Sequence, residues 1–191
     1  MASMLQTLSA GLPALGLELS GSVQETLCAF GEAMVKQNEV MNLTAITEAE
    51  AVAKLHLLDS LGKRMKWLET VLPTLGVTAE CVTARAEEAV ADRRESYDFA
   101  TSRAVARRNI LLELTAPYVK LGGAVLAMKG SAAQEELAEA KNAIKKLGLK
   151  LEKVHTFPID GAEHSVIVLR KVAPTPNQYP RRFAKIKQQP L

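Results

Sequence analysis

Three charged residues stand where predicted strands end, at positions from which side chains can act on a ligand. Glu87, together with Ala86, follows the run "AECVTA" (79–84), Arg103 ends "YDFATSR", and Lys129 ends "GAVLAMK". Open α/β sheets bind their ligands at the carboxyl ends of the strands. A backbone amide and a carboxylate can hydrogen-bond a ring such as adenine. A guanidinium can orient a carboxylate or a phosphate through two parallel hydrogen bonds.

Each of these residues also has a structural interpretation. Glu87 could be a first-turn acid that the helix dipole favours, and the local sequence alone prefers this role. Arg103 could pair with Asp98 or with a neighbouring helix. Lys129 could face a ligand or could simply be solvated, and the sequence favours neither.

The histidines and cysteines do not point to acid–base or metal chemistry. His56, His155 and His164 are far apart in the sequence and form neither a triad nor a metal-binding spacing. Because function is argued from assembled sites, we expect each to be structural. Cys28 and Cys81 have no partners at metal spacing and are expected to be buried thiols of a cytoplasmic protein.

The elements that must position these residues fall into three regions. Residues 1–60 are expected to form a helical cap, because Ser22-x-x-Glu25 and Thr47-x-x-Glu50 are capping boxes. The second box opens a helix that we expect to continue into "AVAKLHLLDS" (51–60). Residues 61–175 are expected to form an α/β domain, and residues 176–191 a basic C-terminal tail.

The α/β prediction rests on alternating helical and β-rich segments after residue 60. An apolar stripe from Leu61 to Leu72 predicts a helix that stops at Gly76, and a second helix is expected from Ser131 to Leu147. Strands are predicted at 79–84, 97–101, 123–128, 151–157 and 165–170. Such alternation indicates parallel pairing in a layered sheet. The last two strands leave no room for a crossover helix and should be antiparallel.

The charge distribution suggests a polyanionic partner. Residues 1–60 hold 7 acids and 2 bases, whereas residues 61–191 hold 14 acids and 22 bases. A basic body pairs readily with phosphates, although it can also be only a solvated surface. The candidate phosphate contacts are two pairs of bases, Lys63 with Arg64 and Arg181 with Arg182. No apolar run approaches the length of a bilayer span, and no secretory signal is expected.

Several short strings, taken in order, resemble one family. They are "NLTAI" (42–46), "KLHLLDS" (54–60), "LLDSLGKRMKWLE" (57–69), "ARAEE" (84–88), "YDFATSRAV" (97–105), "AMKG" (127–130), "HSVIVLRK" (164–171) and "YPRR" (179–182). This set is similar to the bacterial small-subunit rRNA methyltransferase G family, also called glucose-inhibited division protein B. The resemblance implies a cytoplasmic, metal-free enzyme with a Rossmann-like fold that methylates a guanine N7 of 16S ribosomal RNA with S-adenosylmethionine.

The resemblance also assigns roles to the candidate residues. It implies that Ala86 and Glu87 lie at the cofactor and that Arg103 joins the cofactor and substrate sites. Lys129, one strand over, is the second candidate for catalysis. Lys63, Arg64, Arg181 and Arg182 are the candidate RNA contacts.

One feature departs from the family pattern. In the family, a first "HLLDS"-like string closes the cap and a second "LLDS"-like string ends the second strand. Here one string at Leu57–Ser60 serves as both, and no Gly-x-Gly occurs in the 191 residues. The chain is therefore expected to lack about 40 residues, the size of a strand–helix–strand unit. With them go the first two strands and the glycine-rich cofactor loop.

This deletion leaves two functional hypotheses and an ambiguous Asp59. The chain is either a family methyltransferase that lacks part of its cofactor site, or a non-catalytic RNA- or ribosome-binding remnant. In the second-string role Asp59 would accept ribose hydroxyl groups. In the first-string role it would finish the cap helix, which the sequence favours. Sheet edges left unpaired could also permit oligomers.

Overall fold

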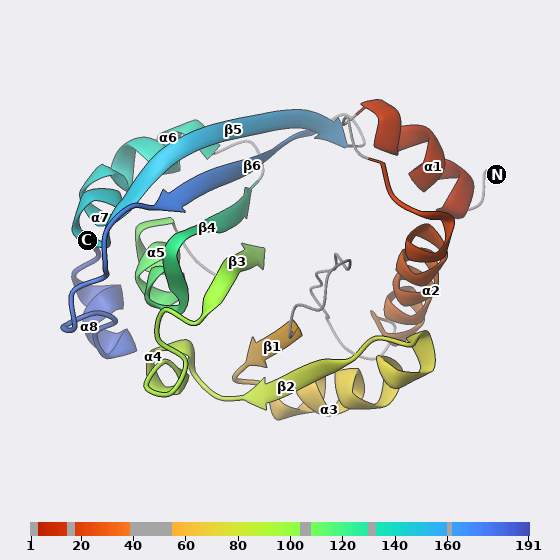
Figure 1. Ribbon diagram of the computed structural model, residues 1–191, viewed down its shortest axis with the longest axis horizontal. Coiled ribbons are helices and arrows are strands. Elements are labelled where there is room, and N and C mark those ends of the chain that lie inside the picture. The colour runs from red at the N-terminus through yellow and green to blue at the C-terminus, as the bar shows by residue number, and fades with distance from the viewer. Residues whose placement is uncertain (1–3, 15–17, 39–54, 104–107, 130–132, 160–161) are drawn as a thin grey trace. The chain divides into compact units, whose positions relative to one another are not determined.

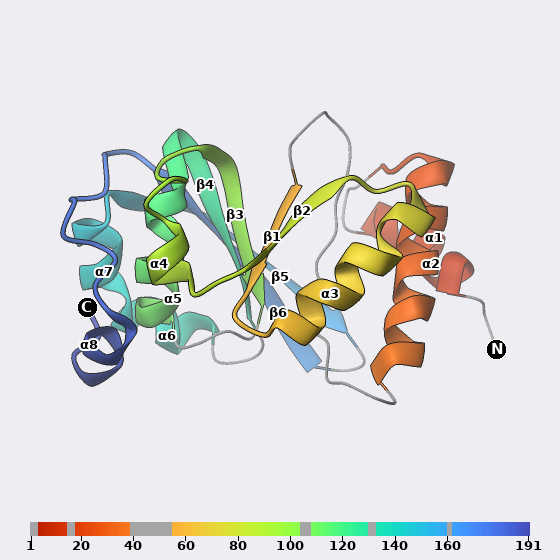
Figure 2. The same cartoon turned by 90° about the horizontal axis from the view of Figure 1, so that it is seen from below.

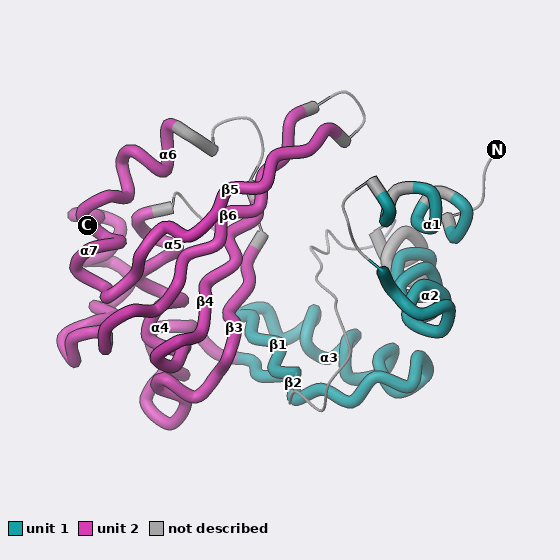
Figure 3. The backbone as a smooth tube through the Cα atoms, turned by 45° about the horizontal axis from the view of Figure 1, so that its top comes forward, with its two compact units in different colours: residues 1–83 teal, residues 84–191 magenta. Residues whose placement is uncertain are grey.

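The computed structural model describes residues 4–14, 18–38, 55–103, 108–129, 133–159 and 162–191 (Figure 1). The chain forms two compact units, Met1–Thr83 and Ala84–Leu191 (Figure 3). Each unit has its own sheet. The units are described separately.

Unit 1 combines helices with a small parallel sheet. Its elements are α1 (Met4–Ala14), α2 (Gly21–Asn38), β1 (Leu55–Asp59), α3 (Gly62–Val71), the 3-10 turn η1 (Pro73–Leu75) and β2 (Ala79–Thr83). Strands β1 and β2 pair in parallel, with α3 as their crossover. The predicted apolar stripe is confirmed for Met65 and Leu72, which are each only 4% exposed, but not for Leu61, which precedes α3 and is 52% exposed. Gly76 ends η1 with a φ of 69°, the left-handed cap expected there.

The expectation of a helix ending near residue 60 is wrong. Leu55–Asp59 is a strand, and Leu55 lies opposite Ala79 while Asp59 lies opposite Thr83. The physical reason is that "LHLLD" is apolar enough for either state, and pairing with β2 overrides the local helical spacing. The helix predicted to open at Thr47 lies outside the described residues.

Unit 2 contains the larger sheet. Its elements are α4 (Ala86–Ala89), β3 (Tyr97–Arg103), α5 (Arg108–Thr115), the 3-10 turn η2 (Ala116–Tyr118), β4 (Val119–Lys129), α6 (Ala133–Glu139), α7 (Lys141–Lys146), β5 (Leu149–Ile159), β6 (Ala162–Lys171) and α8 (Phe183–Gln188). The strand order is β3-β4-β6-β5. Strands β3 and β4 are parallel, whereas β6 is antiparallel to both β4 and β5. The antiparallel ending predicted from the sequence is confirmed.

The core of unit 2 lies on one face of this sheet. Helices α5, α6 and α7 cover that face (Figures 1 and 2). Val125, Ile167 and Leu169 point into it and are 0% exposed, together with Leu112 and Leu147 from the helices. Buried residues recur at every second position along β4 and β6, because successive side chains of a strand point to opposite faces of the sheet. The helix expected over residues 131–147 is observed as α6 and α7.

The C-terminal segment is part of the fold rather than a free tail. Ile186 of α8 is 0% exposed, and α8 packs against α5. Gly148, which has a φ of 73°, lies against the residues that follow β6, and a Cβ there would collide with the carbonyl oxygen of Ala173. The division of the chain at residues 60 and 175 stays a prediction. The two compact units divide the chain between Thr83 and Ala84.

Each unit has its own strand order, β1-β2 in unit 1 and β3-β4-β6-β5 in unit 2. The string that the resemblance assigns to the end of the second strand lies in β1. The expectation that two strands are missing is therefore reduced to one, the first strand.

Candidate functional site

The carboxyl ends of the parallel strands carry most of the predicted site residues. Arg103 ends β3 and lies opposite Met128, the neighbour of Lys129 at the end of β4. The structure therefore brings the backbones of Arg103 and Lys129 to the same end of one sheet. Ala86 and Glu87 form the first turn of α4, directly after β2.

Asp59 ends β1 and holds the start of α3. Its Oδ1 accepts a hydrogen bond from the backbone N–H of Leu61 at 2.8 Å. Its Oδ2 accepts a hydrogen bond from Nη1 of Arg64 at 2.9 Å. The interpretation of Asp59 as the end of a cap helix is therefore wrong, since it stands at a strand end. Each carboxylate oxygen keeps a second lone pair, so a ribose hydroxyl can still be accepted there.

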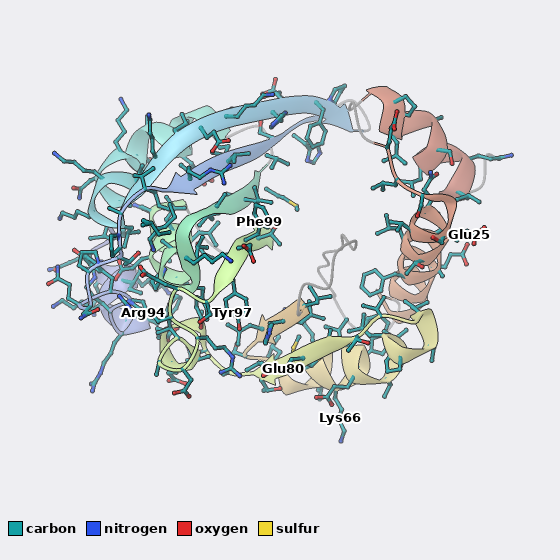
Figure 4. All side chains as sticks on the ribbon, viewed as in Figure 1. Glu25, Lys66, Glu80, Arg94, Tyr97 and Phe99 are labelled. Carbon is teal, nitrogen blue, oxygen red and sulfur yellow. The ribbon has the colours of Figure 1, made fainter. Side chains whose placement is uncertain are left out.

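His56 has the structural role expected of it. Its Nδ1 lies 3.0 Å from Oε2 of Glu80, the residue directly opposite on β2. Figure 4 labels Glu80 on that strand. The pair links β1 to β2 and provides no catalytic arrangement.

Tyr118 anchors α4 and was not predicted from the sequence. Its hydroxyl donates to the carbonyl oxygen of Ala86 at 2.6 Å, and its side chain is 8% exposed. Burial raises the pKa of Tyr118 to about 12. Because Tyr118 is 32 positions from Ala86, no local pattern linked the two residues.

Replacing Tyr118 by Phe should remove a tyrosine that titrates near pH 12. We expect the tyrosinate absorbance that develops around that pH in the wild type to disappear. Losing the hydrogen bond to Ala86 should cost about 0.5–1.5 kcal/mol of unfolding free energy. Since the folded pKa is raised, the contribution of Tyr118 is complete below its unfolded pKa of about 10 and is lost as pH rises toward 12. Identical titration curves for both proteins would contradict this assignment.

Two of the four predicted RNA contacts are engaged within the protein. Arg64 binds Asp59, as described above. The Nε and Nη2 atoms of Arg181 donate to the two carboxylate oxygens of Glu113 at 2.8 and 2.7 Å. The Arg181 backbone N–H also reaches Glu113, at 2.9 Å, and Glu113 is 0% exposed. Arg181 is thus bound within the protein, and its contact with RNA stays a prediction. Lys63 and Arg182 are exposed.

A buried lysine fastens the segment after β6. Nζ of Lys171 donates to the carbonyl oxygen of Ala116 at 2.8 Å and to Oγ1 of Thr175 at 2.6 Å, and it lies 3.2 Å from Oε1 of Glu95. Burial lowers the pKa of Lys171. Arg94, labelled in Figure 4, donates to the carbonyl oxygen of Thr175 at 2.9 Å. The sequence predicted a basic tail near this point. In the structure the residues around Thr175 are instead held by hydrogen bonds from Lys171 and Arg94.

The chain has a Rossmann-like α/β fold that it shares with solved structures. A variant of the 16S rRNA (adenine(1408)-N(1))-methyltransferase from Catenulisporales acidiphilia aligns with a TM-score of 0.50 and 14% identity, over 62% of this chain and 77% of that one. M. jannaschii TYW2 in complex with AdoMet aligns with a TM-score of 0.50 and 12% identity, over 63% and 59%. The predicted fold class is confirmed.

Sequence comparisons identify the family. The family model described as GidB, rRNA small subunit methyltransferase G, matches residues 51–166. The ribosomal RNA small subunit methyltransferase G of Desulfitobacterium hafniense is 36% identical, covering 93% of this chain and 93% of its own length. That of Lactobacillus johnsonii is 44% identical over 71% of this chain and 59% of its own. The chain belongs to this family, as its sequence strings suggested.

The alignment lengths agree with an internal deletion. The alignment with the Desulfitobacterium hafniense protein has 222 positions but covers 93% of a chain of 191 residues, about 178 residues. About 44 positions, 222 less 178, therefore have no residue from this chain. The Lactobacillus johnsonii alignment has 140 positions and covers 71% of the chain, about 136 residues, so it includes almost none of this shortfall.

The residues present fit only part of an S-adenosylmethionine site. Asp59 ends β1, Arg103 ends β3, and Glu87 lies in the first turn of α4. A glycine-rich turn is needed for the backbone to approach the remaining end of such a cofactor. The sequence contains no Gly-x-Gly.

Proposed function

We propose that this chain derives from an enzyme that methylates a guanine N7 of 16S ribosomal RNA with S-adenosylmethionine in the cytoplasm. Its membership of the rRNA small subunit methyltransferase G family carries the proposal. Guanine N7 presents a lone pair and has no proton to remove. Such a reaction needs orientation and charge stabilisation rather than a general base. This agrees with the structural role of His56.

The residues that follow or end the strands would each bind a different part of the cofactor or the RNA. Glu87 and the backbone of Ala86, held by Tyr118, would address the adenine ring. Arg103 and Lys129, on neighbouring strand ends, would orient the cofactor and the target nucleotide. In this proposal the residues present bind the adenine ring and align the target nucleotide. The missing glycine-rich turn would hold the end of the cofactor that carries the methyl group.

The test is transfer of a labelled methyl group to small ribosomal subunits by a chain with the missing segment restored. Because β1 already fills the second strand place, the insert needs a strand, a glycine-rich turn and a helix placed before Leu55. A restored, folded chain that binds the cofactor but methylates no guanine would exclude the proposal.

A second candidate function is RNA or ribosome binding without catalysis. The observation that favours it is that exposed bases remain while the cofactor turn does not. Arg182, Lys185 and Lys187 are all exposed on or beside α8. They could contact phosphates without any cofactor.

Replacing these three bases by Ala should reduce the salt dependence of RNA binding. We expect the slope of log affinity against log salt to flatten by about 0.7 per lost phosphate contact. Removing residues 179–191 would be a poor test, because that segment includes Arg181 and the buried Ile186. The triple replacement Lys141→Ala, Lys145→Ala and Lys146→Ala on α7 removes the same charge from exposed positions and serves as the control. Equal slopes for both triple variants would contradict a specific role for α8.

A further inference from the structure

Strand β3 has an unpaired outer edge with an exposed aromatic residue. Within the described residues β3 pairs only with β4. Phe99, near its middle, is 60% exposed (Figure 4). An unpaired edge presents backbone N–H and C=O groups to which another strand can add.

The sheet face that carries Phe99 has an apolar patch that is only partly covered and that lies beside Thr101, Arg170 and Lys153. Phe99 lies beside Ala124, and two positions further along β4 is Leu126, which lies opposite Val168 of β6. Met128 and Val166 follow on the same face. Leu126, Met128, Val166 and Val168 are partly exposed, whereas Val125, Ala127, Ile167 and Leu169 on the opposite face are 0% exposed. Parallel strands normally have both faces covered, and no described helix of unit 2 covers this one (Figures 1 and 2).

We propose that this edge and face bind a strand–turn–helix segment supplied by another polypeptide. The strand would pair in parallel with the outer edge of β3, and the helix would lie over Phe99, Leu126 and Val168. We refer to these elements together as the acceptor surface.

The open edge of β3, which pairs only with β4 among the described strands, and the length that relatives contain identify this occupant. Relatives contain about 44 positions that this chain lacks, 222 less 178. That length accommodates a strand, a turn and a helix. Parallel strands are usually connected through a helix that packs on the sheet. The helix of the added segment would therefore cover the apolar patch beside the outer edge of β3.

The test uses the full chain and the unmatched segment of the Desulfitobacterium hafniense relative, fused to a soluble carrier domain. We expect saturable binding, measured by fluorescence anisotropy, that weakens at least tenfold in Phe99→Lys. Val172→Lys is the matched control, since Val172 is 52% exposed but follows β6 outside the acceptor surface. Its binding should equal that of the wild type. The carrier alone and a scrambled segment should not bind.

Hydrogen exchange on the unmodified chain gives a readout independent of any variant. The segment should slow amide exchange within Tyr97–Arg103 and leave β5, the opposite edge of the sheet, unchanged. Absence of binding, or binding without protection of β3, would overturn the proposal. Self-association of the chain that Phe99→Lys abolishes would assign the acceptor surface to a second copy instead. Neither readout depends on methyl transfer, so failure here is distinguishable from failure of the proposed function.

Discussion

The 191-residue chain should transfer no detectable methyl group to 16S ribosomal RNA, whereas the chain with a strand–turn–helix insert before Leu55 should do so. The expected difference is large because orientation of the reacting groups contributes roughly 7–11 kcal/mol to such reactions. Glu87, Arg103 and Lys129 remain in the chain. None of them can replace a turn whose backbone must approach the cofactor closely.

The measurement is incorporation of labelled methyl into small ribosomal subunits, with calorimetric titration of S-adenosylmethionine into both proteins. In the restored chain, Arg103→Ala should abolish transfer. His155→Ala should not, because His155 is an exposed residue of β5. Strong transfer by the unrestored chain, dependent on cofactor and lost in its Arg103→Ala variant, would show that the missing turn is dispensable.

The sequence predicted the later strands well because their signals are local. The runs at 79–84, 97–101, 123–128, 151–157 and 165–170 all became strands, several of them longer than expected. Their apolar, β-branched composition between helical segments leaves few alternatives. The string at 55–59 failed for the opposite reason. Its residues suit a helix or a strand equally, and only pairing with β2 decides between them.

The sequence predicted only those candidate site residues that lie at the ends of strands. Arg103 and Lys129 were placed correctly because each closes a recognisable strand. The bonds that hold the site and the tail were not foreseen. Tyr118 and Ala86 are 32 positions apart, and Arg181 and Glu113 are 68 apart. Such pairs arise from the packing of unit 2, and a basic residue in a tail gives no sign that its partner is buried.

Replacing Arg181 by Ala should destabilise unit 2 by about 3–5 kcal/mol, because it would leave the buried carboxylate of Glu113 without its charged partner. Glu113 is 0% exposed and receives hydrogen bonds from the side chain of Arg181 at both oxygens. Nη2 of Arg181 also donates to the carbonyl oxygen of Gln189 at 3.0 Å, so the end of α8 should loosen as well. Urea unfolding followed by circular dichroism measures the loss.

Two further variants separate the loss of this ion pair from a simple loss of positive charge. Arg182→Ala removes an exposed base from the adjacent position and should change the unfolding free energy by less than about 0.5 kcal/mol. Glu113→Leu combined with Arg181→Ala should recover much of the stability lost in Arg181→Ala, since no buried charge then remains unpaired. The two side chains would not be acting as a pair if the unfolding free energies lost in Glu113→Leu and in Arg181→Ala simply added up in the double variant. A full recovery would show that the main cost lies in the unpaired carboxylate of Glu113.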